Sequence, residues 1–176
     1  MLKKFTIIVL AIIAFVACNS EPEKKKVDLK IDEEAFKSFT MNLRLADYMN
    51  QPSYTAGVAK IQYVKDFAEY KKNRPGPGST EEQYFSALGK QFEIEKICTE
   101  VPAKLLKEFD AIQTVELAVP FKGKNYMVTI SREEFEKYTG AKCEDLKKDW
   151  NGAFADKHLF DEAGRKAFYQ KFVKEQ

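Results

Sequence analysis

The 176-residue chain has few of the residues from which most catalytic and metal sites are built. It contains one histidine and three cysteines. His158 has no serine or cysteine near it in a recognisable nucleophile setting, and no flanking signature marks Cys98 as a catalytic thiol. The acidic pairs at 81–82 and 133–134 fall where first helical turns are expected, and carboxylates there interact favourably with the helix dipole. The sequence therefore predicts no enzyme, and it contains no cofactor motif.

The chain also lacks an excess of positive charge. It has 29 basic and 27 acidic side chains, and Lys3 and Lys4 at the start account for the difference. Nucleic-acid-binding proteins usually carry a basic excess clustered on one face. Without that excess or a recognition motif, we expect no nucleic-acid partner.

No hydrophobic run is long enough to span a bilayer as a helix, which takes about 20 residues. The longest run, Phe5–Ala17, has thirteen residues and is interrupted only by Thr6. A short cationic start precedes it and a polar stretch follows it, which is the layout of a secretory signal. We predict a signal peptide over residues 1–17.

The residues Phe15-Val16-Ala17-Cys18 at the end of that run resemble a bacterial lipobox, with phenylalanine where leucine is usual. The resemblance covers the first 18 residues. It implies a bacterial lipoprotein in which Cys18 receives a diacylglyceryl group, often with a further acyl chain such as palmitate, and the chain is cut after Ala17. Asn19 implies the outer membrane by analogy with lipoprotein sorting. An ordinary secretory signal cut after Ser20 is the alternative.

Residues 18–30 are predicted to be the lipidated cysteine followed by a flexible polar tether, residues 19–30, that leads to the folded part. The apolar content of the tether is too low for a packed core. At about 3.3 Å per residue, twelve residues reach up to roughly 40 Å. Residues 31–176 have a length typical of one globular domain.

Cys98 and Cys143 remain after Cys18 is set aside, and their even number suits a disulfide in an exported protein. Closing that loop of about 45 residues would stabilise the fold by roughly 4 kcal/mol. Two buried free thiols are the alternative reading. A zinc site with His158 as a third ligand is weaker, because no close paired ligand spacing occurs.

The folded part shows mainly helical periodicity, with capping residues at Asp32, Ser79, Ser131 and Asp161. One segment alternates apolar and polar residues on both sides of Lys122-Gly123-Lys124, which predicts an antiparallel hairpin over residues 115–130. Pro120 predicts that its strand is an edge or carries a bulge. The expected fold is a mainly α single domain with one β-hairpin. The predicted helices span 33–49, 54–73, 79–98, 102–112, 131–140 and 161–172, with a turn or two at 144–150, and the predicted buried side of the hairpin consists of Leu117, Val119, Tyr126 and Val128.

Fourteen phenylalanines mostly fall on the expected buried stripes, so core packing accounts for them. The expected function is that of a membrane-anchored envelope lipoprotein that binds a protein or an envelope polymer. A periplasmic carrier or chaperone for a hydrophobic ligand such as an acyl chain is the alternative, and it requires a phenylalanine-lined cavity. The first candidates for contact residues are Tyr48, Tyr54, Tyr70 and Trp150.

Overall fold

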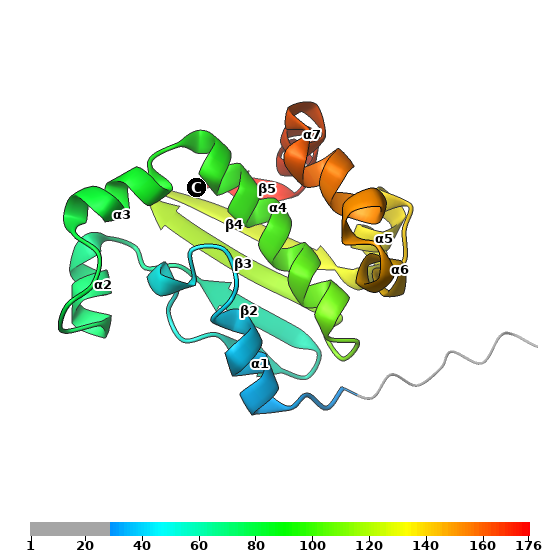
Figure 1. Cartoon of the computed structure of the whole chain (residues 1–176), viewed down its shortest axis with the longest axis horizontal. Helices are drawn as coiled ribbons and strands as arrows, with labels where there is room; N and C mark the ends of the chain where they lie inside the picture. The colour runs from blue at the N-terminus through cyan, green and yellow to red at the C-terminus, as the bar shows by residue number, and fades with distance from the viewer. Residues whose placement is uncertain (1–28) are drawn as a thin grey trace, which may run out of the picture.

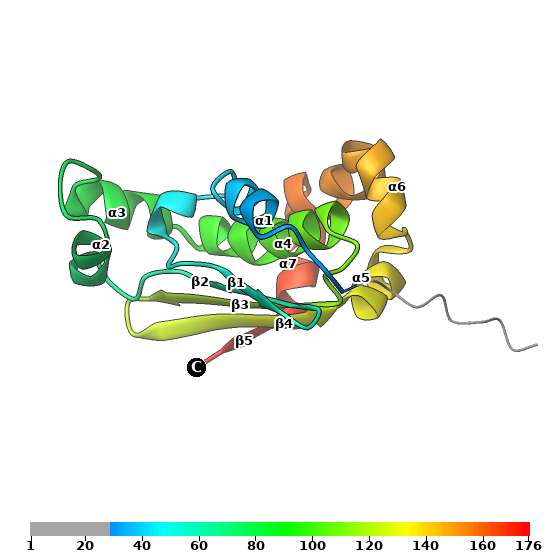
Figure 2. The same cartoon turned by 90° about the horizontal axis from the view of Figure 1, so that it is seen from below.

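The computed structural model of the chain describes residues 29–176. It contains a five-stranded mixed sheet with helices packed on one face (Figures 1 and 2). The predicted signal peptide, the cleavage site at Ala17 and the lipidation site at Cys18 lie outside the described residues. Within residues 29–176, no helix is both long enough and apolar enough to cross a membrane.

The sheet overturns the expectation of a mainly helical fold with a single hairpin. Its strand order is β1-β2-β3-β4-β5, with β2 and β3 parallel and the other neighbours antiparallel. The strands are β1 (Ser53–Thr55), β2 (Val58–Gln62), β3 (Thr114–Phe121), β4 (Lys124–Ser131) and β5 (Val173–Glu175).

The predicted hairpin is confirmed as β3 and β4, and its buried side is the one expected. Side chains alternate between buried and partly exposed along β3, as a strand covered on one face requires. Leu117, Val119, Tyr126 and Val128 are all buried beneath the helices.

Pro120 does not mark an edge strand, because β3 is the central strand of the five. The main-chain N–H and C=O of Asn125, opposite Pro120, bond to Gln176 on the other side of β4. The nitrogen of Pro120 therefore points toward β2. The paired residues of β2 end at Gln62 opposite Ala118, so a proline at 120 removes no hydrogen bond of the sheet.

The predicted helix over residues 54–73 is wrong in its first half. Residues 53–62 form the β1–β2 hairpin, and only α2 (Phe67–Asn73) is helical. Ala59, Ile61 and Tyr63 are buried at every second position, which is a strand pattern. The spacing of Ile61, Val64 and Ala68 also fits a helix, and the parallel pairing with β3 decides between the two.

One long helix, α4 (Gln91–Glu108), lies across the covered face of the sheet (Figure 1). The predicted start of a separate helix at Pro102 is wrong, because α4 runs through this residue. Ile94, Ile97, Val101 and Leu105 continue one buried stripe past Pro102. A proline inside a helix costs about 3 kcal/mol, and we attribute its tolerance to the burial of this stripe.

The other helices surround α4 and the sheet. Asp32, Ser131 and Asp161 cap helices as predicted, whereas the third cap is Thr80 with Gln83 rather than Ser79. The first helix ends at Thr40, short of the predicted 49. These helices are α1 (Glu33–Thr40), the 3₁₀ turn η1 (Ala46–Tyr48), α3 (Glu81–Leu88), α5 (Arg132–Thr139), α6 (Cys143–Lys148), the π-helix η2 (Asn151–Phe160) and α7 (Glu162–Phe172).

The described chain begins at one end of the sheet. The hydroxyl of Tyr54 donates to the Leu29 carbonyl at 2.8 Å, beside the β1–β2 turn. This turn lies next to the start of β3, whereas the β3–β4 turn lies at its other end. Eight strand residues separate these ends by about 26 Å.

Candidate functional site

His158 lies in an aromatic cluster and not in a reactive constellation. Its ring centroid is 5.4 Å from those of Tyr138 and Phe154, and its side chain is buried. Burial lowers its pKa, with nearby Lys157 as a second cause. The ring thus packs between two aromatic side chains, and burial favours its neutral form.

Cys98 and Cys143 are separate free thiols, both buried, so the structure has no disulfide between them. Cys98 lies in the middle of α4, and Cys143 begins α6. Burial raises both pKa values, that of Cys143 to about 12. Within residues 29–176, no three histidine, cysteine or acidic residues are placed to hold a metal ion, and Cys98, Cys143 and His158 do not form such a group.

The four predicted contact residues are buried or half-buried. Tyr48 and Tyr70 are buried, and the Tyr48 hydroxyl donates to Ser79 at 2.9 Å. Tyr54 binds the carbonyls of Leu29 and Ala111, and the half-buried Trp150 packs on Phe154. The prediction that Tyr48 and Tyr70 are exposed contact residues is wrong.

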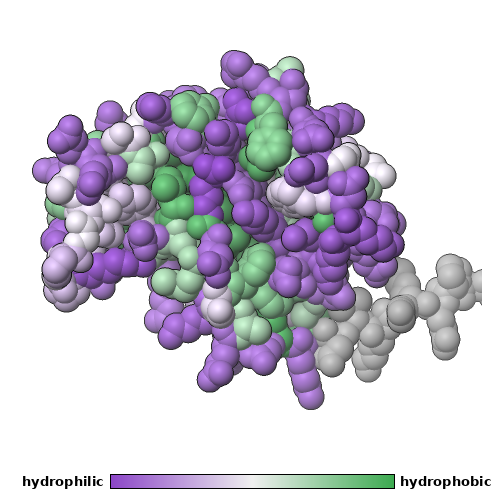
Figure 3. Space-filling model, viewed as in Figure 1, coloured by the Kyte–Doolittle hydropathy of each residue, from purple (hydrophilic) through white to green (hydrophobic). Residues whose placement is uncertain are grey.

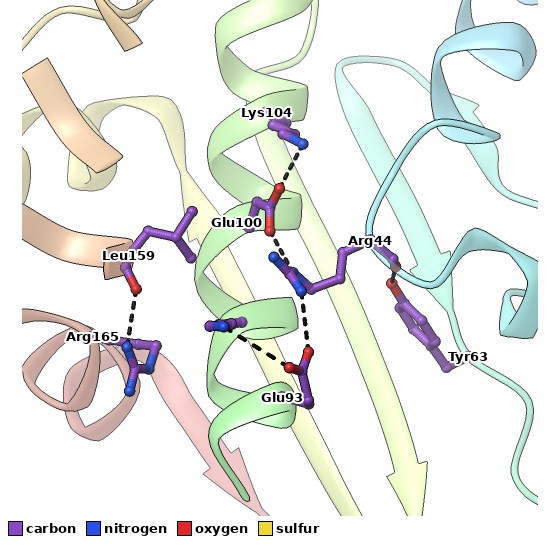
Figure 4. A network of polar contacts seen from close by, with 8 residues as sticks. Arg44, Tyr63, Glu93, Glu100, Lys104, Leu159 and Arg165 are labelled. Atoms are coloured by element: carbon purple, nitrogen blue, oxygen red, sulfur yellow. Dashed lines mark hydrogen bonds and ion pairs between the residues drawn. The ribbon is translucent and has the colours of Figure 1, made fainter. Parts of the chain in front are cut away.

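Charged side chains gather along the outer side of α4 (Figure 4). Arg44, from the loop after α1, donates to Glu100 at 2.5 Å and to Glu93 at 3.1 Å. Lys104 pairs with Glu100 at 2.5 Å, and the Tyr63 hydroxyl donates to the carbonyl of Arg44. These carboxylates are held by cations, so the cluster braces the loop against α4.

A second arginine braces the other flank of α4. Arg165 on α7 donates from Nε to Glu95 at 3.2 Å and from Nη1 to the carbonyl of Leu159 at 3.0 Å. Both charged side chains are buried. The pair fastens α7 to α4.

A large open groove of about 1110 Å³ runs beside the edge strand β1, between α1 and α2. Phe36 is the one phenylalanine among its lining residues. Its polar groups bond mainly to one another, as Asn50 does to Glu69 and to Asn73. This groove does not have the phenylalanine lining that an acyl-chain carrier requires.

A smaller hollow of about 290 Å³ lies between the α3–α4 turn and the β3–β4 turn. We call it the tip pocket. Leu88, Ile94 and Phe121 are buried and give it an apolar floor. Its lining residues are Leu88, Gly89, Gln91, Ile94, Phe121, Lys122, Lys124 and Tyr126.

Two exposed phenylalanines lie beside residues that line the tip pocket, and lysine ammonium groups lie near aromatic rings there. Phe85 is 41% exposed and its ring centroid lies 6.1 Å from that of Phe121. The Lys122 ammonium lies 5.3 Å from the centre of the Phe121 ring, at cation–π distance. Phe92, 38% exposed in the first turn of α4, has the Lys96 ammonium 4.8 Å from its ring centre.

Figure 3 shows a mostly polar face with hydrophobic side chains in patches, including the region where α3 meets α4. Phe85 and Phe92 fall in the helix predicted over residues 79–98, whose apolar residues were expected to be buried, whereas both are exposed. Lys122-Gly123-Lys124 was predicted only as a turn. The two phenylalanines lie far from the two lysines in the chain, so no local sequence pattern indicated that these side chains meet. The one available signal was a phenylalanine, Phe121, directly before a hairpin turn that carries two lysines.

The chain was compared with protein-family models, curated protein sequences and solved structures, and none of them matches it. Its function therefore has to be inferred from its own residues and their arrangement.

Proposed function

We propose that this chain is a bacterial envelope lipoprotein, held on a membrane by acyl chains on Cys18, whose domain binds a protein or an envelope polymer without catalysis. The outer membrane is the proposed location. The lipobox-like residues 15–18 and the polar tether support the anchor. The observation that carries the binding role is the position of the tip pocket at the end of the sheet opposite Leu29.

That placement suits a domain that reaches outward from its anchor. The tether joins the domain beside the β1–β2 turn, so this end is attached to the anchor. The tip pocket lies at the opposite end, where the tether leaves it accessible to another envelope component. A tether of up to roughly 40 Å adds to this reach.

Core packing favours binding over carriage of a hydrophobic ligand. Phe135, Phe154 and Phe168 are fully buried and pack against one another and their neighbours. A carrier would hold such side chains around an empty cavity.

The anchor is tested by replacing the lipidated cysteine. In the native host, we expect the wild-type protein in the membrane fraction, with mass spectrometry showing an acylated Cys18 at the mature amino terminus. Cys18→Ser should leave the membrane fraction or remain uncleaved. Unchanged processing and partition of this variant would overturn the anchor.

The binding role is tested by a photo-crosslinking amino acid placed at Phe85 in living cells. We expect a discrete crosslinked product from this position. Phe160 on η2 is 60% exposed and is the matched control, because it is an exposed phenylalanine outside the tip pocket. Crosslinks at position 160 and none at position 85 would contradict a binding role for the tip.

A further inference from the structure

We infer that the tip pocket binds an acidic segment of a partner protein, which inserts one apolar side chain between Phe121 and the α3–α4 turn. This inference rests on the proposed binding function and names the chemistry of the partner. It is drawn from the shape of the pocket, the charge around it and its place in the molecule.

The shape suits an inserted side chain. A volume of about 290 Å³ is at the scale of one or two large side chains and is much smaller than the groove beside β1. Leu88, Ile94 and Phe121 form a preformed apolar floor. Protein interfaces concentrate their binding energy where an anchor side chain fills such a pocket.

The charge at the rim selects an acidic partner. Lys122 and Lys124 line the pocket, and Lys90 lies in the adjoining turn. Within residues 29–176, Lys124 pairs with Glu175, whereas Lys122 has no carboxylate within ion-pair distance. Among residues 29–176, Lys90 likewise has no ion-pair partner, so Lys90 and Lys122 are two cations at this end that no carboxylate there neutralises. Complementary charge speeds association and fixes the orientation of a partner.

The arrangement of the aromatic rings and the position of the pocket both favour a protein segment over a lipid surface. Phe85 packs against Phe121, and the Lys122 ammonium lies near both rings at 5.9 and 5.3 Å. Aromatic side chains arranged around a hollow suit a convex ligand, whereas membrane insertion favours side chains that project outward. The pocket also lies at the end of the sheet opposite the tether.

Displayed peptide libraries test the inference on the full mature lipoprotein in neutral phosphatidylcholine nanodiscs. One library has four fixed glutamates around two randomised positions, and the control library has lysines in place of the glutamates. We expect enrichment only from the acidic library, with leucine, phenylalanine or similar side chains at the randomised positions. No enrichment, or enrichment independent of the apolar positions, would overturn the inference.

Binding of a selected fluorescent peptide should then depend on the tip. Lys122→Asn removes the charge and suits the backbone, because Lys122 has φ 50° and asparagine adopts this conformation readily. We expect it and Phe85→Ser each to weaken binding at least tenfold. Lys148→Asn and Phe160→Ser make the same changes at exposed positions elsewhere and should stay within twofold of wild type. Equal losses in both sets would refute the tip as the site.

Binding to phosphatidylglycerol vesicles is the competing outcome, and it is measured with the same variants. Vesicle binding that Lys122→Asn and Phe85→Ser abolish, without peptide binding, would replace the acidic segment with an anionic lipid surface. A crosslink from position 85 that persists while both libraries fail would leave the proposed binding function standing and remove this inference.

Discussion

Two arginines fasten distant parts of the chain to the central helix. Arg44 lies 49 and 56 positions from Glu93 and Glu100, and Arg165 lies 70 positions from Glu95. The Arg165–Glu95 pair has side chains only 8% and 7% exposed, so solvent screens it little. Each charge is stabilised mainly by the other, because neither has ready access to water.

Arg165→Met should therefore be strongly destabilising. It leaves Glu95 buried without its cation, and breaking a buried pair in this way costs about 3 kcal/mol or more. Urea denaturation followed by circular dichroism measures the loss.

The matched variant removes both charges. Glu95→Leu combined with Arg165→Met should recover much of the lost stability, because no buried charge is left uncompensated. The loss of stability caused by Glu95→Leu is compared in the wild type and in the Arg165→Met variant. Equal losses in the two backgrounds would show that the pair is not coupled.

Glu100 should make the stability of the domain depend on acid pH. Burial alone would raise its pKa, but hydrogen bonds from Lys104 and Arg44 more than offset burial and lower the pKa below its ordinary 4.5. A group with a lowered folded pKa stabilises the fold above its unfolded pKa. That stabilisation is lost as the pH falls through the folded pKa.

Glu100→Gln should thus be less stable than wild type at pH 7, and the difference should shrink as the pH falls below about 4.5. Free energies of unfolding from urea titrations between pH 7 and pH 3 provide the measurement. A difference that is constant over this range would exclude Glu100 as a source of the pH dependence.

At the scale of elements, two tight turns decide where strands begin. Ala56 and Gly57 have φ values of 47° and 86°, and Lys122 and Gly123 have 50° and 79°. Two consecutive residues with positive φ are typical of type I′ turns, which match the twist of antiparallel strands. Alanine and lysine are strained there, whereas asparagine is well suited to the first position.

Ala56→Asn should therefore stabilise the domain by about 0.5 to 1 kcal/mol, because it relieves the strain at a left-handed position on the surface. Chemical denaturation of the variant and of wild type measures the gain. Ala56→Val is the opposing control and should destabilise, because a β-branched side chain resists positive φ. The reverse order of stability would argue against the β1–β2 hairpin.

At the scale of the whole molecule, one hydrophobic core joins the helices to the sheet. It extends from Phe36 on α1 through the inner face of β3 and β4 to Phe168 on α7. Figure 2 shows α1, α4 and α7 on the same side of the sheet. A continuous core of this kind unfolds as a unit.

We expect residues 29–176 to unfold in one transition. Trp150 is the only tryptophan and packs on Phe154, so its fluorescence reports on the η2 region. Its transition should coincide with the loss of far-ultraviolet circular dichroism, which reports on the whole fold. Two separated transitions would show that η2 and α7 form an independent unit.

The sequence by itself determined the features that depend on neighbouring residues. Asp32, Ser131 and Asp161 cap helices because a short polar side chain reaches the N–H groups two or three positions later. The β3–β4 hairpin followed from strict alternation around a glycine turn. The resemblance of residues 15–18 to a lipobox is likewise a local pattern, and the anchor that it predicts stays a prediction.

Only the tertiary structure decided the rest, because the deciding contacts join residues far apart in the chain. The spacing around Ile61 fits a helix or a strand, and pairing with Leu117 selects the strand. Ile97, Val101 and Leu105 keep α4 intact through Pro102 because the sheet covers them. The tip pocket exists because α3, α4 and the β3–β4 turn meet at one end of the sheet, and no local pattern encodes that meeting.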